Sequence, residues 1–176
     1  ILTGGPGTGK TTTTIGLIEL FEELGFKIVL AAPTGRAAKK LSEATRRFAR
    51  TIHRLLVYNP REKRFTKNEQ NPIRADVVIL DEVSMIDVIL MQSLLKAITE
   101  NTFLVLIGDI DQLPSVGPGN LLKDLIDSEV IPVVRLTHIF RQKAKSLIIL
   151  NAHRVNQGKY PILNVKQNKD FFFLKE

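Results

Sequence analysis

Apolar and polar residues alternate along the chain in a pattern that predicts strands and helices following one another. Four apolar runs have the length of buried strands and cover residues 27–32, 75–80, 103–107 and 131–136. Apolar residues at helical spacing predict helices over residues 11–24, 35–48, 86–98, 119–126 and 144–156, and a short helical segment over 51–56. This order implies right-handed crossovers and therefore an α/β fold, a parallel sheet with helices on both faces.

One polar stretch, residues 58–75, does not fit this alternation. It contains two Asn-Pro pairs, at residues 59–60 and 71–72, which are turn signals. We therefore expect an insertion between the short helical segment and the strand that follows it.

Composition narrows the class of protein. The chain has 176 residues, 44% hydrophobic and 24% charged, which is typical of one globular domain. Its apolar runs are too short to span a membrane, and no membrane partner is expected. The absence of cysteine excludes disulfides and thiolate metal sites and is compatible with a reducing cytosol, so we expect a cytoplasmic protein. The net charge of +7 favours a polyanionic partner such as nucleic acid or a membrane surface.

Residues 4–11, GGPGTGKT, match the phosphate-loop (P-loop) pattern G-x-x-x-x-G-K-[ST] at every fixed position. In such a loop the glycines let backbone N–H groups converge on phosphates, and the helix that opens there adds its positive dipole end. Lys10 is expected to reach the β- and γ-phosphates, and the hydroxyl of Thr11 to bind Mg²⁺. A glycine-rich turn that only caps a helix is the disfavoured alternative. The residues expected to bind the nucleotide are Gly5, Pro6, Gly7, Thr8, Gly9, Lys10, Thr11 and Thr12.

Two acids end the second of the four predicted strands. Asp81 follows four apolar residues, so its carboxylate is expected at the sheet edge where the phosphates lie, holding Mg²⁺ directly or through water. Glu82 is the candidate general base that orients and deprotonates the attacking water. Two solvated acids after a strand would be the alternative without the P-loop upstream.

Two further residues are candidates for contact with the γ-phosphate. Gln112 follows the next predicted strand, and its amide can donate to a phosphate oxygen and accept from water. Arg141 follows the last predicted strand and could clamp the transferring phosphoryl group. Taken alone, Arg141 would be an ordinary surface arginine.

The motifs occur in a characteristic order: the P-loop is followed by APTGRAAKKL, TIHRLL, LDEVSM, GDIDQLPSVGPGN and LTHIFRQ. In this order the chain closely resembles the RecD/TraA family of superfamily 1 DNA helicases from residue 1 to about residue 158. The resemblance implies a RecA-like P-loop NTPase fold, ATP hydrolysis with Mg²⁺, and five-prime to three-prime translocation along single-stranded DNA in recombination or repair. Lys10, Glu82, Gln112 and Arg141 then take catalytic roles, and Thr11 and Asp81 hold the metal.

The resemblance also implies DNA contacts. Segments 33–36 and 51–54 face the DNA strand in the family, which points to Pro33, Thr34, Arg36, Thr51, His53 and Arg54. Hydroxyl, imidazole and guanidinium groups can bind phosphates, and the arginines can stack on bases. His53 alone would more often be an ordinary packed or surface histidine.

Residues 56–74 resemble the short β-hairpin that forms the strand-separating pin of the family. Residues 56–58 and 64–66 can pair around a turn at 59–63, with Tyr58 and Phe65 offering apolar surface. A simple exposed loop is the alternative.

By this resemblance, residues 1–176 form a first RecA-like motor domain, truncated at both ends. The chain opens at Ile1 rather than Met, and we expect a piece of a longer protein. The expected partners are single-stranded DNA and a second RecA-like domain of the parent chain, with subunits of a RecBCD-like complex an open possibility. Two other functions stay open: a nucleotide-responsive DNA-binding module without turnover, and a nucleotide kinase.

Overall fold

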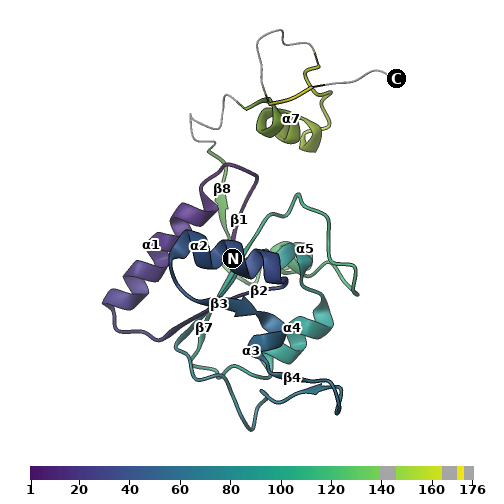
Figure 1. The fold of residues 1–176 in the computed structure, drawn as a ribbon. Helices are drawn as coiled ribbons and strands as arrows, with labels where there is room; N and C mark the ends of the chain where they lie inside the picture. Colours follow the sequence, from purple (N-terminus) through teal and green to yellow (C-terminus); the bar gives the residue numbers. More distant parts are fainter. Residues whose placement is uncertain (139–145, 164–169, 173–176) are drawn as a thin grey trace.

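The computed structural model describes residues 1–138, 146–163 and 170–172. Its centre is a six-stranded sheet in the order β3-β2-β6-β7-β1-β8, with parallel pairing throughout (Figure 1). The strands are β1 (Leu2–Gly4), β2 (Ile28–Ala32), β3 (Ala49–Thr51), β6 (Val77–Leu80), β7 (Phe103–Gly108) and β8 (Val134–Leu136). The predicted α/β class and parallel sheet are confirmed.

Helices cover both faces of this sheet, as predicted. They are α1 (Lys10–Glu23), α2 (Gly35–Thr45), α3 (Ile52–Leu55), α4 (Val88–Leu95) and α5 (Leu121–Asp127), with a 3-10 turn η1 (Val83–Met85). The last helix, α7 (Leu147–Asn156), lies apart from both faces, against the loop that follows β1 (Figure 1). The alternating side chains of β6 separate two cores. Val77 and Ile79 pack with the buried residues of α1 and α2, whereas Val78 and Leu80 pack with those of α3, α4 and α5.

The edge strand β3 was not predicted. The expected helix over 35–48 ends at Thr45, because Arg46 adopts the left-handed conformation (φ 55°, ψ 30°). The chain then turns back and pairs Ala49 with Leu30 of β2. Three residues, of which the middle one is an exposed arginine, carry no periodic signal of a strand.

The expected helix over 86–98 is shorter than predicted. Asp87 is the N-cap of α4, since its Oδ1 accepts the N–H of Leu90 at 2.7 Å. Met91 and Leu94 are buried, whereas Leu95 is 51% exposed.

The insertion is a β-hairpin, so the alternative of a simple loop is wrong. Strands β4 (Tyr58–Asn59) and β5 (Arg64–Phe65) pair antiparallel, with Tyr58 opposite Phe65. The ring centroids of Tyr58 and Phe65 lie 5.3 Å apart, and that of His53 lies 6.2 Å from Tyr58 and 5.6 Å from Phe65. The hairpin is therefore packed against α3.

Among the residues that the structure describes, every helix is too short or too polar to cross a lipid bilayer.

Replacing Arg46 by glycine is expected to stabilise the fold. A non-glycine residue in the left-handed region is strained by about 1 kcal/mol, and glycine removes most of this strain at the end of a helix. We expect the melting temperature to rise by about 1–4 °C, because about 1 kcal/mol corresponds to about 2–4 °C in a domain of this size. Differential scanning calorimetry measures this change. Lys39→Gly, an exposed change inside the same helix, should lower the melting temperature by a similar amount. A destabilised Arg46→Gly variant would contradict the strain argument.

Candidate functional site

The P-loop connects β1 to α1 at the carboxyl edge of the sheet. Gly7 (φ 82°) and Gly9 (φ 94°) have left-handed backbones, which glycine adopts without strain. A Cβ on Gly4 would lie 2.5 Å from the carbonyl oxygen of Leu136 in β8, so only glycine fits beside this strand. The hydroxyl of Thr8 donates to the carbonyl of Gly5 at 2.8 Å and closes the loop on itself.

The side chains on the first turn of α1 differ in whether they face the loop, the solvent or the helix itself. Lys10 donates from Nζ to the carbonyls of Gly4 (2.5 Å) and Gly5 (3.2 Å), so its ammonium lies over the loop. Thr11 and Thr12 are exposed on the first turn of α1, whereas the hydroxyl of Thr14 donates back into the helix, to the carbonyl of Lys10 at 2.8 Å. Thr11 therefore has the exposure that the expected contact with Mg²⁺ requires.

Asp81 lies at the carboxyl end of β6, half-buried. Burial raises the pKa of its carboxyl group, while the N–H of Glu82, donated to Oδ1 at 2.9 Å, and the charges of Lys40 and Lys10 act in the opposite direction. A partly desolvated carboxylate is a hard oxygen ligand that a divalent cation would stabilise. Asp81 and the hydroxyl of Thr11 are therefore the side-chain oxygens that this edge of the sheet offers to a magnesium ion.

Glu82 has an unusual backbone for its position. It adopts the left-handed conformation (φ 55°, ψ 44°) as the N-cap of η1, and its side chain is 24% exposed. Residues in this region are strained by about 1–3 kcal/mol and are frequent at functional sites. The ammonium of Lys40 on α2 lies 4.0 Å from Oε1 of Glu82.

Lys40 was missed by the sequence analysis. On α2 it lies one turn after Arg36, at the i,i+4 spacing that places both side chains on one face. Both residues line a pocket of about 250 Å³ together with Glu82 and Gln112. The spacing relative to Arg36 was the signal that could have identified it.

The loop after β7 brings Gln112 to the acids. Asp109 is 2% exposed and holds the loop: its Oδ1 accepts the N–H of Asp111 at 3.1 Å, and its carbonyl accepts the N–H of Gln112 at 3.2 Å. The hydroxyl of Ser84, two residues after Glu82, lies 3.4 Å from Oε1 of Gln112. Because β7 lies between β6 and β1, this loop stands between the acids and the P-loop.

Arg141, the other candidate for the γ-phosphate, lies outside the described residues.

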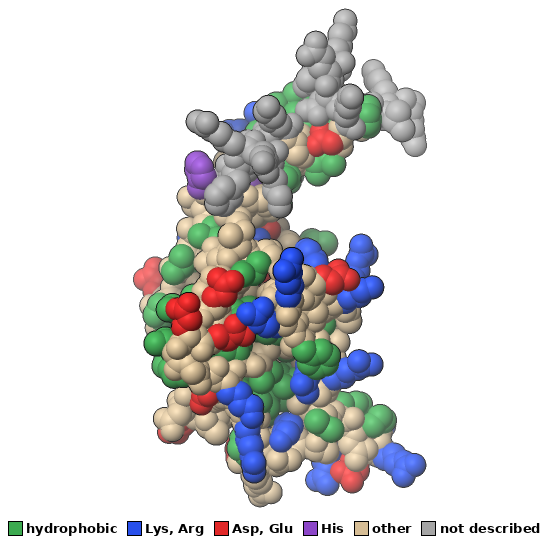
Figure 2. Space-filling model, turned by 60° about the vertical axis from the view of Figure 1, so that its left-hand side comes forward, with side chains coloured by type: hydrophobic (Ala, Val, Ile, Leu, Met, Phe, Trp, Pro, Cys, Tyr) green, Lys and Arg blue, Asp and Glu red, His purple; other side chains and the backbone are tan. Residues whose placement is uncertain are grey.

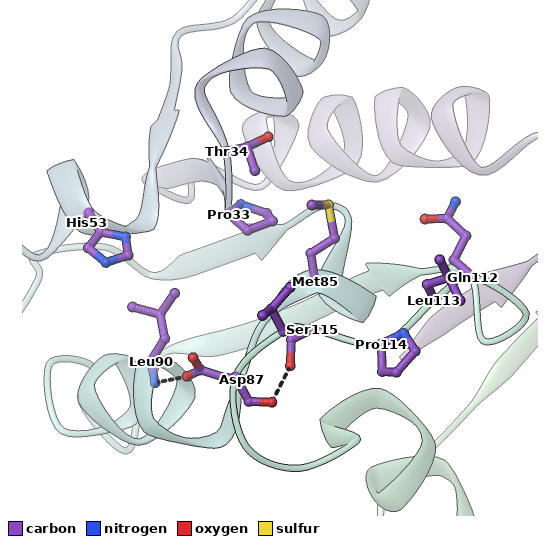
Figure 3. Close-up of a pocket in the computed structure, with 12 residues that line it drawn as sticks. Pro33, Thr34, His53, Met85, Asp87, Leu90, Gln112, Leu113, Pro114 and Ser115 are labelled. Atoms are coloured by element: carbon purple, nitrogen blue, oxygen red, sulfur yellow. Dashed lines mark hydrogen bonds between the residues drawn. The ribbon is translucent and has the colours of Figure 1, made fainter.

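A groove of about 650 Å³ extends between Gln112 and His53 (Figure 3). Figure 3 shows Gln112 toward one end and His53 toward the other, with Pro33 and Thr34 on one wall. The residues that line the groove are Pro33, Thr34, His53, Met85, Asp87, Leu90, Gln112, Leu113, Pro114, Ser115, Val116 and Gly117. Three predicted DNA-contacting residues, Pro33, Thr34 and His53, thus share a groove with Gln112.

The two predicted DNA-contacting threonines have a structural role that the sequence analysis did not foresee. Thr34 Oγ1 accepts the N–H of Ala37 at 3.2 Å and caps α2, and Thr51 Oγ1 accepts the N–H of Arg54 at 3.2 Å and caps α3. A hydroxyl that accepts in a cap keeps its own proton to donate. Both threonines therefore still have a donor for a phosphate.

Positive charge accompanies this part of the sheet. Figure 2 shows Lys and Arg side chains gathered on one side of the face that it presents, with Asp and Glu mainly on the other. Exposed basic residues follow one another from α2 through β3 to α3, namely Arg36, Lys39, Lys40, Arg46, Arg47, Arg50 and Arg54. Such a distribution favours a polyanion.

Asp81→Asn is expected to stabilise the nucleotide-free fold at neutral pH. A pKa raised in the folded state means that the folded protein prefers the protonated acid. The free energy of unfolding of the wild type therefore falls as pH rises from the ordinary aspartate pKa through the raised one. Thermal unfolding is measured between pH 4 and pH 8 without Mg²⁺. The melting temperature of Asp81→Asn should exceed that of the wild type by an amount that grows with pH. Glu100→Gln, which removes a charge at an exposed position, is the control. Equal curves for wild type and Asp81→Asn would contradict the burial argument.

Comparison with known proteins agrees with this geometry. Residues 1–118 match the protein family described as AAA domain. The chain is 47% identical over 161 residues to the ATP-dependent RecD2 DNA helicase of Deinococcus radiodurans, covering 92% of this chain and 22% of that protein. It is 42% identical over 150 residues to the RecBCD enzyme subunit RecD of Mycobacterium tuberculosis, covering 72% of this chain and 26% of that subunit. The chain thus spans about a quarter of the length of these curated relatives.

Solved structures of Bacteroides Pif1 share the fold. The crystal structure bound to ssDNA has a TM-score of 0.62 at 22% identity and covers 90% of this chain and 42% of that one. The complex with ADP-AlF4 has a TM-score of 0.55 at 27% identity and covers 80% and 38%. By its matched family, its sequence relatives and its fold, the chain belongs to the AAA domain family as a RecD-like superfamily 1 helicase motor domain.

Proposed function

We propose that this chain is the first motor domain of an ATP-dependent DNA helicase, which binds ATP with Mg²⁺, hydrolyses it and contacts single-stranded DNA. The observation that carries the proposal is the shared position of Gln112. It lines the pocket of Glu82 and also the groove of Pro33, Thr34 and His53. One side chain thus joins the two candidate sites, as a machine that couples hydrolysis to movement on DNA requires.

The P-loop binds the triphosphate. The N–H groups of Gly5, Gly7, Thr8 and Gly9 and the start of α1 hold the phosphate oxygens, and Thr12 flanks them on the first turn. The Lys10 ammonium moves from the loop carbonyls to the β- and γ-phosphates. Thr11 and Asp81 would hold Mg²⁺, which would neutralise charge on the phosphates.

Glu82 orients and deprotonates the attacking water. The Lys40 ammonium lies 4.0 Å from its Oε1, and the left-handed backbone fixes the direction of its side chain. Gln112 contacts the γ-phosphate, and its hydrogen bond with Ser84 links it to the turn behind Glu82. Arg141 is proposed as the cationic clamp.

DNA occupies the groove and its basic rim. Thr34, Thr51 and His53 bind phosphates, Pro33 lines the wall, and Arg36 and Arg54 pair with phosphates or stack on bases. The hairpin of β4 and β5 acts as the strand-separating pin, since its aromatic pair rests on His53.

The parent protein is proposed to carry a second RecA-like domain that closes the nucleotide cleft. Five-prime to three-prime movement, recombination or repair as the process, subunits of a RecBCD-like complex as partners, and a cytoplasmic location all stay predictions. They rest on the resemblance and on the relatives named above.

Substitution of Lys10 and of Glu82 should separate nucleotide binding from hydrolysis. Lys10→Ala removes charge-assisted hydrogen bonds and should weaken MgATP binding about 10- to 100-fold in calorimetric titration. Glu82→Gln should bind MgATP within about threefold of wild type, yet lose hydrolysis at least about 100-fold in single-turnover assays of the protein with its second motor domain. Equal loss of binding in both variants would refute the assigned roles.

Substitution of Arg54 should weaken DNA binding in a salt-dependent way. Loss of one phosphate contact reduces the slope of log K against log salt by about 0.7 for single strands, and we expect affinity to fall about 3- to 10-fold. Fluorescence anisotropy of a labelled oligothymidylate across NaCl concentrations measures both quantities. Arg36→Ala should behave alike. Arg74→Ala is the matched control, because this exposed arginine precedes β6 at the opposite edge of the sheet. An unchanged slope in Arg54→Ala and Arg36→Ala would rule out phosphate contact.

A further inference from the structure

We propose that His153 of α7 is a positioning residue for the P-loop, which sets the direction of the N–H groups that receive phosphate. The inference rests on the proposed binding of ATP, and it gives α7 a role that neither the motifs nor the catalytic residues assign.

The first observation is a hydrogen bond across most of the chain. Nε2 of His153 lies 3.2 Å from the carbonyl oxygen of Pro6, a residue 147 positions earlier. A carbonyl can only accept, so His153 donates and its Nε2 carries the proton. The half-buried imidazole is therefore oriented toward the loop.

The consequence follows from the planarity of the peptide bond. In a trans peptide the C=O and the next N–H point in opposite directions, so a fixed Pro6 carbonyl also fixes the N–H of Gly7. Gly7 is the first left-handed residue of the loop. Holding the Pro6 carbonyl toward α7 thus turns the Gly7 N–H to the side away from α7.

Two other side chains, those of Lys10 and Thr8, also hydrogen-bond to carbonyls of the loop, but neither can replace His153 once nucleotide is bound. Lys10 holds the carbonyls of Gly4 and Gly5, but it must leave them to reach phosphate. The hydroxyl of Thr8 holds only the carbonyl of Gly5. His153 binds a carbonyl that neither of them touches, so it can keep the loop in place after Lys10 has moved.

The second observation is the fit of the imidazole against Gly5. A Cβ on Gly5 would lie 2.6 Å from Cε1, 3.3 Å from Nε2 and 3.4 Å from Nδ1 of His153, and these are its three nearest atoms. The backbone conformation of Gly5 does not itself require glycine, since its φ lies outside the left-handed region. We conclude that Gly5 is a glycine because His153 packs on it.

The element that carries His153 is itself rigidly built. Asn151, 4% exposed, donates from Nδ2 to the carbonyl of Ile162 at 3.1 Å and accepts its N–H at 2.7 Å. Nε of Arg154 donates to the carbonyl of Tyr160 at 2.9 Å. These hydrogen bonds hold the helix and the segment after it together. His153 lines a cavity of about 260 Å³ together with residues of the P-loop and Asp111.

A double-mutant cycle between Gly5 and His153 tests the proposal. His153→Ala should weaken MgATP binding about 3- to 10-fold in calorimetric titration, the effect of one lost hydrogen bond. His153→Gln should restore part of the affinity, because its amide N–H can donate to Pro6. Gly5→Ala should weaken binding strongly beside His153, and much less in the Gly5→Ala, His153→Ala double variant, where the clash is gone. Asn156→Ala, an exposed change on the same helix, is the control and should bind MgATP as the wild type does.

Hydrogen exchange of the P-loop amides in the nucleotide-free chain gives a readout that does not depend on ATP. His153→Ala should speed exchange at residues 7–10, while Asn156→Ala should not. An equal penalty for Gly5→Ala in both backgrounds, or unchanged P-loop exchange in His153→Ala, would overturn the proposal. If the wild type does not bind MgATP, or Lys10→Ala binds equally well, the proposed function fails, and the exchange result still decides the role of His153.

Discussion

The parallel register of the sheet is the constraint on which the rest of the structure depends. All six strands run in one direction, so their carboxyl ends, and the polar residues that follow them, meet at one edge. The central strand β6 is buried along its whole length and delivers Asp81 and Glu82 to that edge. Because β7 separates β6 from β1, the Gln112 loop stands between the acids and the P-loop. A change in strand order would leave every motif intact and still separate the groups that must act together.

The candidate site concentrates features that do not favour folding. Asp81 is a half-buried acid with a raised pKa, Glu82 has a left-handed backbone, and the P-loop needs glycines at Gly7 and Gly9. Strain and desolvation of this kind are tolerated where the surrounding structure over-determines the conformation. Here the two cores on either side of β6 supply that support, and the charges of Lys10 and Lys40 offset part of the cost of ionising Asp81.

Local signals predicted the elements of this site well, because each motif follows its strand directly along the chain. The P-loop, the acids after β6, the Gln112 loop and the hairpin at residues 56–74 all lie where the sequence suggested. What escaped prediction depends on contacts between distant segments. The edge strand β3 exists only through its pairing with β2, and Lys40 has a role only because α2 passes beside Glu82. His153 meets Pro6 across 147 positions, and no periodicity in a helix indicates such a contact.

The central claim is that one edge of the sheet gathers a single metal-nucleotide site. A crystal structure of the chain with ADP, aluminium fluoride and Mn²⁺ in place of Mg²⁺, with the manganese located by anomalous scattering, tests it most directly. The account predicts the ion between the Thr11 hydroxyl and the Asp81 carboxylate, with Glu82 and Gln112 facing the fluoride that stands for the γ-phosphate. An ion bound elsewhere, or a nucleotide whose phosphates lie away from the loop of Gly7 and Gly9, would contradict it.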